Sequence, residues 1–318
     1  MPSAIRSILP APSLALALMA CVFLPSARAQ APPLLRQFSV GRGSAPTYLA
    51  LDHGGNLYVS EQADRVELYS PTGTLLSSVG GQGSSPGQFN QPSGIGVDPA
   101  GNLYVADVGN HRIQKFSAVG TFLAQWGSAG SGPGQFGAYI SLAVDASGIV
   151  YVIDPYNMRI QRFQADGTYL GQFDGSGHFQ DIKDIAFDAA GNGYVPDVGS
   201  HCIHVLAPDG TYLRSWCAGF YDPGFLENPY QVGLDASGNL YAPDFASEVK
   251  AFSSGGAFLS AWTEPNGLNG AFNPLGVAID AHGEVFVSDW NNGVISVFGQ
   301  IPTAAVPLSW GKLKALYR

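Results

Sequence analysis

Charged residues are scarce in this chain, and positive ones are the scarcest. Lysine and arginine number 15 of 318 residues, against 24 aspartates and glutamates. Removing a leader over residues 1–29 takes away two arginines and no acid, which leaves 13 cations, 24 acids and a formal charge of −11. Because a nucleic-acid surface needs many cations to neutralise phosphates, the composition argues against a nucleic-acid partner.

No apolar run is long enough to suggest a membrane span. The run from Leu14 to Leu24 is too short to cross a bilayer. It follows Arg6 and precedes Ala27-Arg28-Ala29, which is typical of a cleaved secretory signal. We therefore expect a secreted or periplasmic protein, cleaved near Ala29, with no transmembrane segment. Lipid attachment at Cys21 is the less favoured alternative, because the apolar run continues beyond it.

Cysteine is rare, and only two cysteines remain after signal cleavage. Cys202 and Cys217 lie at nearly equal distances on either side of the turn Pro208-Asp209-Gly210. In an oxidising compartment this spacing predicts a cross-strand disulfide that closes a loop of about 15 residues. The alternative is a pair of buried thiols.

Common catalytic motifs are missing as well. The sequence has no Gly-x-Ser-x-Gly, no phosphate-binding loop and no Cys-x-x-Cys. Nucleophilic, nucleotide-dependent and dithiol chemistries thus lack support. We predict no catalytic residue, no metal ligand and no cofactor.

What the chain does contain is a sixfold repeat. Each unit has an Asp at the end of a short apolar strand. Successive Asp residues are 43 to 47 positions apart: Asp52, Asp98, Asp145, Asp188, Asp235 and Asp280. A period of this length with several short strands per unit is typical of a β-propeller. We therefore predict an all-β fold, a six-bladed β-propeller with four-stranded antiparallel blades.

Positions within the repeat support this architecture. Apolar residues alternate before each Asp, as Ile95 and Val97 do before Asp98, and the residue between them is always Gly or Ala. An innermost strand near a crowded axis requires such small residues. The turn after the Asp contains a glycine such as Gly101, where a positive φ is expected.

The chain ends predict how the ring closes. The sixth repeat stops at Phe298-Gly299 without a fourth strand, and residues 34–38 match the fourth strand of another repeat, residues 122–126. The N-terminal strand should therefore complete the last blade and remove the open sheet edges. The predicted domains are a signal peptide over 1–29, a propeller over 30–299, and a Pro-containing linker with a basic amphipathic tail over 300–318.

The second repeat resembles a known family. Its segments Gly101-Asn102-Leu103-Tyr104-Val105 and Asn110-His111-Arg112-Ile113-Gln114-Lys115-Phe116 are similar to the NHL repeat of six-bladed propellers, and the resemblance covers residues of about 34–299. The resemblance implies a propeller, but it leaves function open, because such propellers serve as binding platforms and also carry lyase or lactonase sites. A streptogramin-lyase type of propeller, with seven blades, conflicts with six repeats.

Residues that could bind a metal do not form a recognisable set. Each blade carries a second acid nine residues after the first, and because these acids repeat with the fold we interpret them as structural: Glu61, Asp107, Asp154, Asp197, Asp244 and Asp289. Resemblance to an amidating lyase would imply zinc-binding histidines at the channel mouth. The mouth positions, five residues before each repeat Asp, are instead Thr47, Ser93, Ile140, Lys183, Tyr230 and Leu275. A lactonase would need a divalent metal held by Glu, Asn and Asp side chains. Only a handful of candidates, such as Asp184 and Gln231, lie near the expected mouth.

Aromatic residues in loops that differ between blades are the candidate binding site. They are Tyr156, Phe220, Tyr221, Tyr230, Phe245 and Trp290, with Lys183 beside them in the channel mouth. Exposed aromatics on one face suit a glycan or an extended peptide. The alternative is that they pack between blades. We therefore predict noncovalent binding of a protein, peptide or glycan, with a metal-dependent lyase or hydrolase in the central channel as the alternative. The sequence assigns no oligomeric state.

Overall fold

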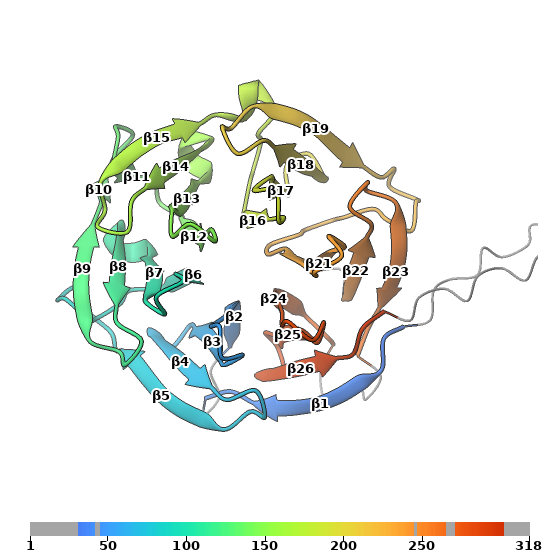
Figure 1. Cartoon of the computed structure of the whole chain (residues 1–318), viewed down its shortest axis with the longest axis horizontal. Coiled ribbons are helices and arrows are strands. Elements are labelled where there is room, and N and C mark those ends of the chain that lie inside the picture. Colours follow the sequence, from blue (N-terminus) through green and yellow to red (C-terminus); the bar gives the residue numbers. More distant parts are fainter. Residues whose placement is uncertain (1–30, 42–44, 245–246, 265–270, 302–318) are drawn as a thin grey trace, which may run out of the picture.

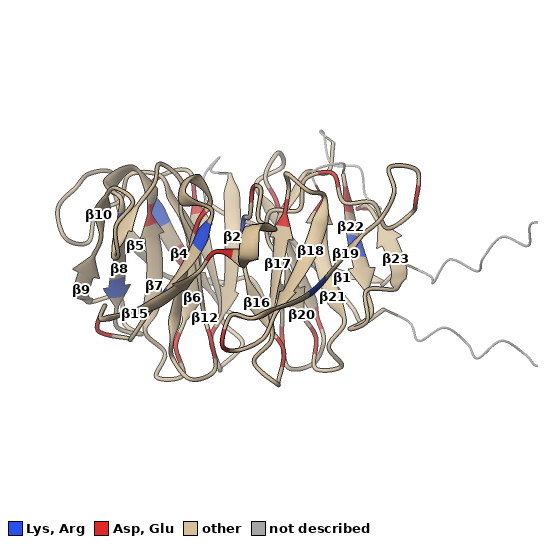
Figure 2. Ribbon diagram, turned by 90° about the horizontal axis from the view of Figure 1, so that it is seen from above, with Lys and Arg blue, Asp and Glu red and all other residues tan. Residues whose placement is uncertain are grey.

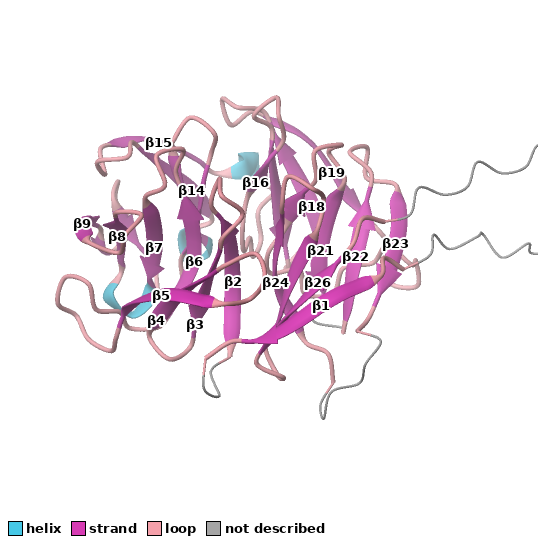
Figure 3. Ribbon diagram, turned by 60° about the horizontal axis from the view of Figure 1, so that its bottom comes forward, coloured by secondary structure: helices cyan, strands magenta, loops and turns pink. Residues whose placement is uncertain are grey.

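The strands of this protein form a closed ring of six blades around a central channel (Figure 1). The computed structural model describes residues 31–41, 45–244, 247–264 and 271–301. The predicted signal peptide and most of the predicted tail lie outside the described residues. Each blade is a four-stranded antiparallel sheet, as the repeat predicted, and strands dominate the ribbon (Figure 3).

Each blade runs outward from the channel in four steps. The inner strands are β2 (Pro46–Leu51), β6 (Pro92–Val97), β12 (Ser141–Val144), β16 (Ala186–Phe187), β20 (Gly233–Leu234) and β24 (Pro274–Ile279). The second strands are β3 (Leu57–Glu61), β7 (Leu103–Asp107), β13 (Val150–Asp154), β17 (Gly193–Asp197), β21 (Leu240–Asp244) and β25 (Val285–Asp289).

The third and fourth strands complete the blades. The third strands are β4 (Arg65–Tyr69), β8 (Arg112–Phe116), β14 (Arg159–Phe163), β18 (Cys202–Leu206), β22 (Glu248–Phe252) and β26 (Val294–Phe298). The outer strands are β5 (Leu75–Gly80), β9 (Phe122–Trp126), β15 (Tyr169–Phe173), β19 (Tyr212–Cys217), β23 (Phe258–Trp262) and, in the sixth blade, β1 (Leu34–Ser39). The remaining short elements are β10 (Ser128–Ala129), β11 (Gln135–Phe136), η1 (Val108–Asn110), η2 (Pro155–Asn157) and η3 (Gly175–Gly177).

The N-terminal strand closes the ring, as predicted. β1 pairs antiparallel with β26, and Phe38 lies opposite Ile295. The Phe38 ring packs on Tyr69 of the first blade with centroids 5.5 Å apart. Arg36 forms an ion pair with Glu284 of the sixth blade. Both ends of the propeller are therefore held in one sheet, which gives the sixth blade the same four strands as the others.

The repeat Asp organises the turn that follows each inner strand. Asp98 accepts backbone N–H bonds from Ala100 and Asn102, and it also accepts the Tyr104 hydroxyl. Gly101 has φ of +83° in this turn, where a side chain would be strained. The two backbone bonds recur around Asp52, Asp145, Asp188, Asp235 and Asp280. The tyrosine hydroxyl bond recurs at Asp145, Asp188 and Asp235. We call this side of the ring the turn face, and the side where the inner strands begin the mouth face.

In the second to sixth blades the second acid accepts a backbone N–H of the loop that enters the blade. Asp107 is fully buried and accepts the Asn90 N–H, the Asn110 amide and the Arg112 guanidinium, the last at 2.7 Å. Acids therefore lie along both rims of the ring (Figure 2). All six second acids have no exposed surface. Their repetition is explained by this anchoring role, as the sequence suggested.

The fourth blade replaces an arginine of this network by a disulfide. In the second and third blades, Arg112 and Arg159 reach from the third strand to a glutamine on the outer strand. In the fourth blade the equivalent position is Cys202, which lies directly opposite Cys217 and is bonded to it. The covalent link thus joins the same two strands that hydrogen bonds join in the neighbouring blades.

Candidate functional site

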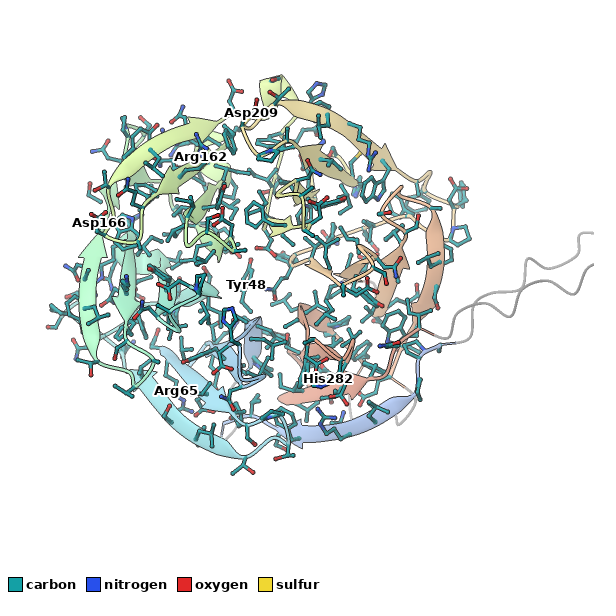
Figure 4. All side chains as sticks on the ribbon, in the orientation of Figure 1. Tyr48, Arg65, Arg162, Asp166, Asp209 and His282 are labelled. Carbon is teal, nitrogen blue, oxygen red and sulfur yellow. A yellow bond between two sulfur atoms is a disulfide. The ribbon has the colours of Figure 1, made fainter. Side chains whose placement is uncertain are left out.

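The channel mouth is ringed by two positions that differ between blades. The mouth ring, five residues before each repeat Asp, comprises Thr47, Ser93, Ile140, Lys183, Tyr230 and Leu275. The inner ring, one residue further along, comprises Tyr48, Gly94, Ser141, Asp184, Gln231 and Gly276. Tyr48 lies near the centre of the propeller (Figure 4). Since a sixfold scaffold does not require different residues at equivalent positions, these two rings are where blade-specific function can reside.

Local irregularities of the inner strands place these residues. In the first, second and sixth blades the inner strand has one extra residue relative to its partner, between Pro46 and Leu49 and at the equivalent positions. In the fourth and fifth blades the ladder is also interrupted, and isolated bridges at Ile182 and Pro229 precede the short strands β16 and β20. A β-bulge changes the direction of the side chains within it. In the first, second and sixth blades the bulged residues are those of the mouth ring and the inner ring.

Gln231 bridges three blades across the channel. Its Oε1 accepts the N–H of Leu49 at 3.1 Å and the N–H of Val277 at 3.0 Å, while its Nε2 donates to the Leu49 carbonyl at 2.9 Å. Inner strands expose one unpaired backbone edge to the channel, and buried backbone groups need partners. A single amide therefore satisfies three such groups.

Asp184 lies beside Gln231 and is 3 % exposed. Its Oδ2 accepts the N–H of Val232 at 3.1 Å. Burial raises the pKa of Asp184 to about 8, against a partial lowering by backbone hydrogen bonds. The carboxyl is therefore protonated at neutral pH and adds no charge to the channel.

Two phenols complete this level of the channel. The hydroxyls of Tyr48 in the first blade and Tyr139 in the third blade are 2.8 Å apart. Gly94, the inner-ring residue of the blade between them, has no side chain. Burial raises the pKa of both tyrosines well above the usual range, so both remain uncharged.

Lys183 is the cation of the mouth ring, and it already has partners. Its Nζ is 2.6 Å from Asp181 Oδ1. The ammonium also lies over the rings of Tyr139 and Tyr230, 5.4 and 5.7 Å from their centroids. The charge is thus balanced by a carboxylate and held between two aromatic faces.

Above this level lies a cavity of about 450 Å³ that opens on the mouth face. We call it the cup. It is lined by Thr47, Tyr48, Gln62, Gln91, Pro92, Ser93, Val108, Tyr139, Tyr230, Leu275 and Trp290. A second cavity, of about 780 Å³, runs between the inner strands to the turn face and has Asp184 and Gln231 among its lining residues. The two cavities share no lining residue, so the inner ring separates the cup from the channel.

The predicted aromatic residues fall into two groups. Tyr156, Phe220 and Tyr221 are 71 %, 71 % and 95 % exposed, so none of them packs between blades. Tyr230 and Trp290 line the cup instead. Lys183 lies next to Tyr230, as described above. The sixth predicted residue, Phe245, lies outside the described residues.

The histidines and acids of the described chain do not form a metal centre. Among the residues that the structure describes, no three His, Cys, Asp or Glu side chains lie close enough together to hold a metal ion. His111 and His201 instead bond backbone carbonyls of neighbouring loops, at Gly137 and Leu226. Asp184 and Gln231, which the sequence offered as candidate ligands for a lactonase-like site, accept hydrogen bonds from backbone N–H groups. In the same described residues no helix is long and apolar enough to span a membrane.

Sequence reasoning missed several residues that line the cup, among them Gln62, Gln91 and the two phenols Tyr48 and Tyr139. Tyr48 directly follows the mouth position, and Tyr139 lies in the loop that enters the third blade. The signal that could have identified Tyr48 is the variation of the inner ring from blade to blade. Tyr139 lies outside the repeat pattern and carries no such signal.

Comparisons with known proteins agree on the fold. The profile of the NHL repeat matches residues 89–116. No curated protein matches the chain. Among solved structures, a streptogramin B lyase is similar with 14 % identity and a TM-score of 0.58, covering 84 % of this chain and 87 % of the other.

A further similar structure is a catalytically inactive variant of virginiamycin B lyase from Staphylococcus aureus with quinupristin. It is 10 % identical, has a TM-score of 0.59, and covers 85 % of this chain and 90 % of the other. At such identities the likeness establishes a shared β-propeller architecture and carries no activity to this chain.

Proposed function

We propose that this protein, a six-bladed propeller of the NHL-repeat family, is a noncovalent binding module whose ligand enters the cup on the mouth face. The observation that carries the proposal is the cup itself. It is concave, lined by four aromatic side chains and a few uncharged polar groups, and closed below by the inner ring. Such composition is typical of pockets that bind small ligands.

The state of the surrounding groups supports binding over catalysis. Asp184 is protonated, Lys183 is paired with Asp181, and the phenols are uncharged. General acid or base catalysis favours a group whose pKa lies near the working pH and that can reach the ligand. Asp184 has such a pKa, but it lines the lower cavity and not the cup.

Export forms part of the proposal. We place the protein outside the cytoplasm after cleavage near Ala29, secreted or periplasmic. The disulfide between Cys202 and Cys217 supports this location, because disulfides persist in oxidising compartments. The ligand would then be a protein, peptide or glycan of that compartment.

The alternative is a lyase or hydrolase with its site in the central channel. Its support is the likeness in fold to a streptogramin B lyase and a virginiamycin B lyase. A metal-dependent version needs ligands that the described residues do not bring together.

A binding screen with matched variants tests the proposal. Peptides, neutral oligosaccharides and acidic oligosaccharides are titrated against the wild type, Trp290→Ala and Tyr156→Ala. We expect a ligand whose affinity falls at least about tenfold in Trp290→Ala, since aromatic anchors in pockets carry much of the binding energy. Tyr156→Ala, on an exposed loop away from the cup, should leave that affinity unchanged. A ligand lost only in Tyr156→Ala would move the site to the outer loops.

Metal analysis of the purified protein distinguishes the binding module from the metal-dependent enzyme. A stoichiometric divalent ion retained through dialysis, with turnover of a bound ligand, would favour the enzyme. Binding without turnover, unaffected by a chelator, would favour the module.

A further inference from the structure

We infer that the cup accepts the end of an uncharged glycan chain. This inference rests on the proposed function, because it assumes that the cup is the binding site. Three features of the cup carry it: the absence of ionised groups among its described lining residues, its closed floor, and its aromatic walls.

No described lining residue carries a charge at neutral pH. The titratable groups among the eleven are phenols, and burial raises the pKa of Tyr48 and Tyr139 well above the usual range. The nearest cation, Lys183, is held by Asp181 at 2.6 Å. A charged group that entered the cup would lose its hydration, and the nearest cation is already paired with a carboxylate, so its entry would be costly. The cup therefore selects for neutral ligand groups.

The closed floor determines which part of a polymer can enter. The hydroxyl pair of Tyr48 and Tyr139 lies at the base of the cup, and Gln231 ties the inner strands together beneath. The inner ring is closely packed at this level: Tyr48 is 3 % exposed, and a Cβ added at Gly94 or Gly276 would lie 2.1 or 2.2 Å from atoms of the neighbouring blade. This packing prevents a chain from passing through into the lower cavity. Only a chain end, or a small molecule, fits.

Chain ends distinguish glycans from peptides. A peptide ends in an ammonium or a carboxylate group, both ionised near neutral pH. A neutral glycan ends in hydroxyl groups, which need hydrogen bonds and no counter-ion. The charge-free lining thus favours the glycan over the peptide.

The walls provide both kinds of contact that a sugar ring requires. Trp290, Tyr230 and Tyr139 offer aromatic surface to the apolar face of a ring. Gln62 and Gln91 stand exposed at the rim, where their amides can donate to and accept from hydroxyls. A volume of about 450 Å³ lies within the range of small-ligand sites, and it admits a mono- or disaccharide unit.

The test uses three matched sets of probes on the full chain. The first set comprises neutral di- to tetrasaccharides of glucose, mannose, galactose and N-acetylglucosamine. The second comprises the same chains with a uronic acid at the end. The third comprises tetrapeptides with free ends and with acetylated and amidated ends. Binding is followed by calorimetry in wild type, Trp290→Ala, Gln62→Ala and, as control, Tyr156→Ala.

The expected result is that at least one neutral saccharide binds and that a terminal uronic acid weakens it more than tenfold. Binding should fall at least tenfold in Trp290→Ala and severalfold in Gln62→Ala, and stay unchanged in Tyr156→Ala. Gln62 has an exposed side chain, so its variant keeps the test valid if Trp290→Ala does not fold.

The remaining outcomes overturn the inference in distinguishable ways. If acidic saccharides or peptides bind in a manner sensitive to Trp290 or Gln62 while neutral saccharides do not, the ligand class is wrong and the cup remains the binding site. If no probe responds to either cup variant, the proposed function fails as well.

Discussion

Asp184 offers the sharpest physical test of the structure, through the replacement Asp184→Asn. The amide keeps an acceptor for the Val232 N–H and supplies a donor where the protonated carboxyl carries its hydrogen. Asparagine therefore imitates the folded-state form of this residue but cannot ionise in the unfolded chain. The two proteins should differ only in how pH affects their stability.

The sign of the effect follows from the raised pKa. Burial raises the pKa of Asp184 from 3.8 to about 8, so between these values the unfolded chain releases a proton that the folded protein keeps. The free energy of unfolding of the wild type should therefore fall as pH rises through this window, by about 1.4 kcal/mol per pH unit from this one group. The stabilisation that Asp184 adds to the folded protein is fully present below pH 3.8 and is lost by about pH 8.

Urea unfolding at pH 5, 6, 7 and 8 measures this effect. Other titrating groups are common to both proteins, so the difference in unfolding free energy isolates Asp184. That difference should shift in favour of Asp184→Asn by roughly 3–4 kcal/mol between pH 5 and pH 8. A difference that stays constant over this range would show that Asp184 is ionised in the folded protein, and the account of an uncharged inner ring would be wrong.

Three further predictions concern the scaffold. Deleting residues 30–40 should lower the free energy of unfolding by at least about 3 kcal/mol, because it removes β1 and the contact of Phe38 with Tyr69; an unchanged melting temperature would contradict ring closure by β1. Mass spectrometry of unreduced peptides should find Cys202 joined to Cys217, a link that contributes about 3 kcal/mol if unstrained, whereas two freely alkylated thiols would rule it out. Arg112→Ala should cost about 3–5 kcal/mol, because it leaves the buried Asp107 without its ion-pair partner; a loss below about 1 kcal/mol in urea unfolding would refute the anchoring role.

The sequence was sufficient to predict the fold because the scaffold repeats. The Asp turns, the small residues of the inner strands and the closing strand are each dictated by a requirement that every blade shares. A requirement met six times produces a pattern that stands out from a single sequence. The closure by residues 34–38 could be predicted for the same reason, since the last blade lacks a strand that the others have.

The cup could be predicted only in part, because its geometry depends on departures from the repeat. Four of the six mouth-ring residues, Tyr230 among them, line the cup. The extra residue before Leu49 and the interrupted ladders near Ile182 and Pro229 are invisible in the pattern. These irregularities turn the inner ring toward the channel, and without them Asp184 and Gln231 looked like two isolated polar residues.

Repetition within a propeller thus distinguishes residues that stabilise the fold, which recur between blades, from residues that bind the ligand, which do not. Arg112 and Asp107 recur in the third blade as Arg159 and Asp154, so their loss should lower stability and leave the cup intact. Trp290 lines the cup and Gln62 is exposed at its rim, so their loss should weaken binding with little change in the free energy of unfolding. If Arg112→Ala, still folded under the assay conditions, lost ligand binding as completely as Trp290→Ala, the blades and the cup would be energetically coupled. Blade-to-blade variation would then no longer identify the functional residues of this ring.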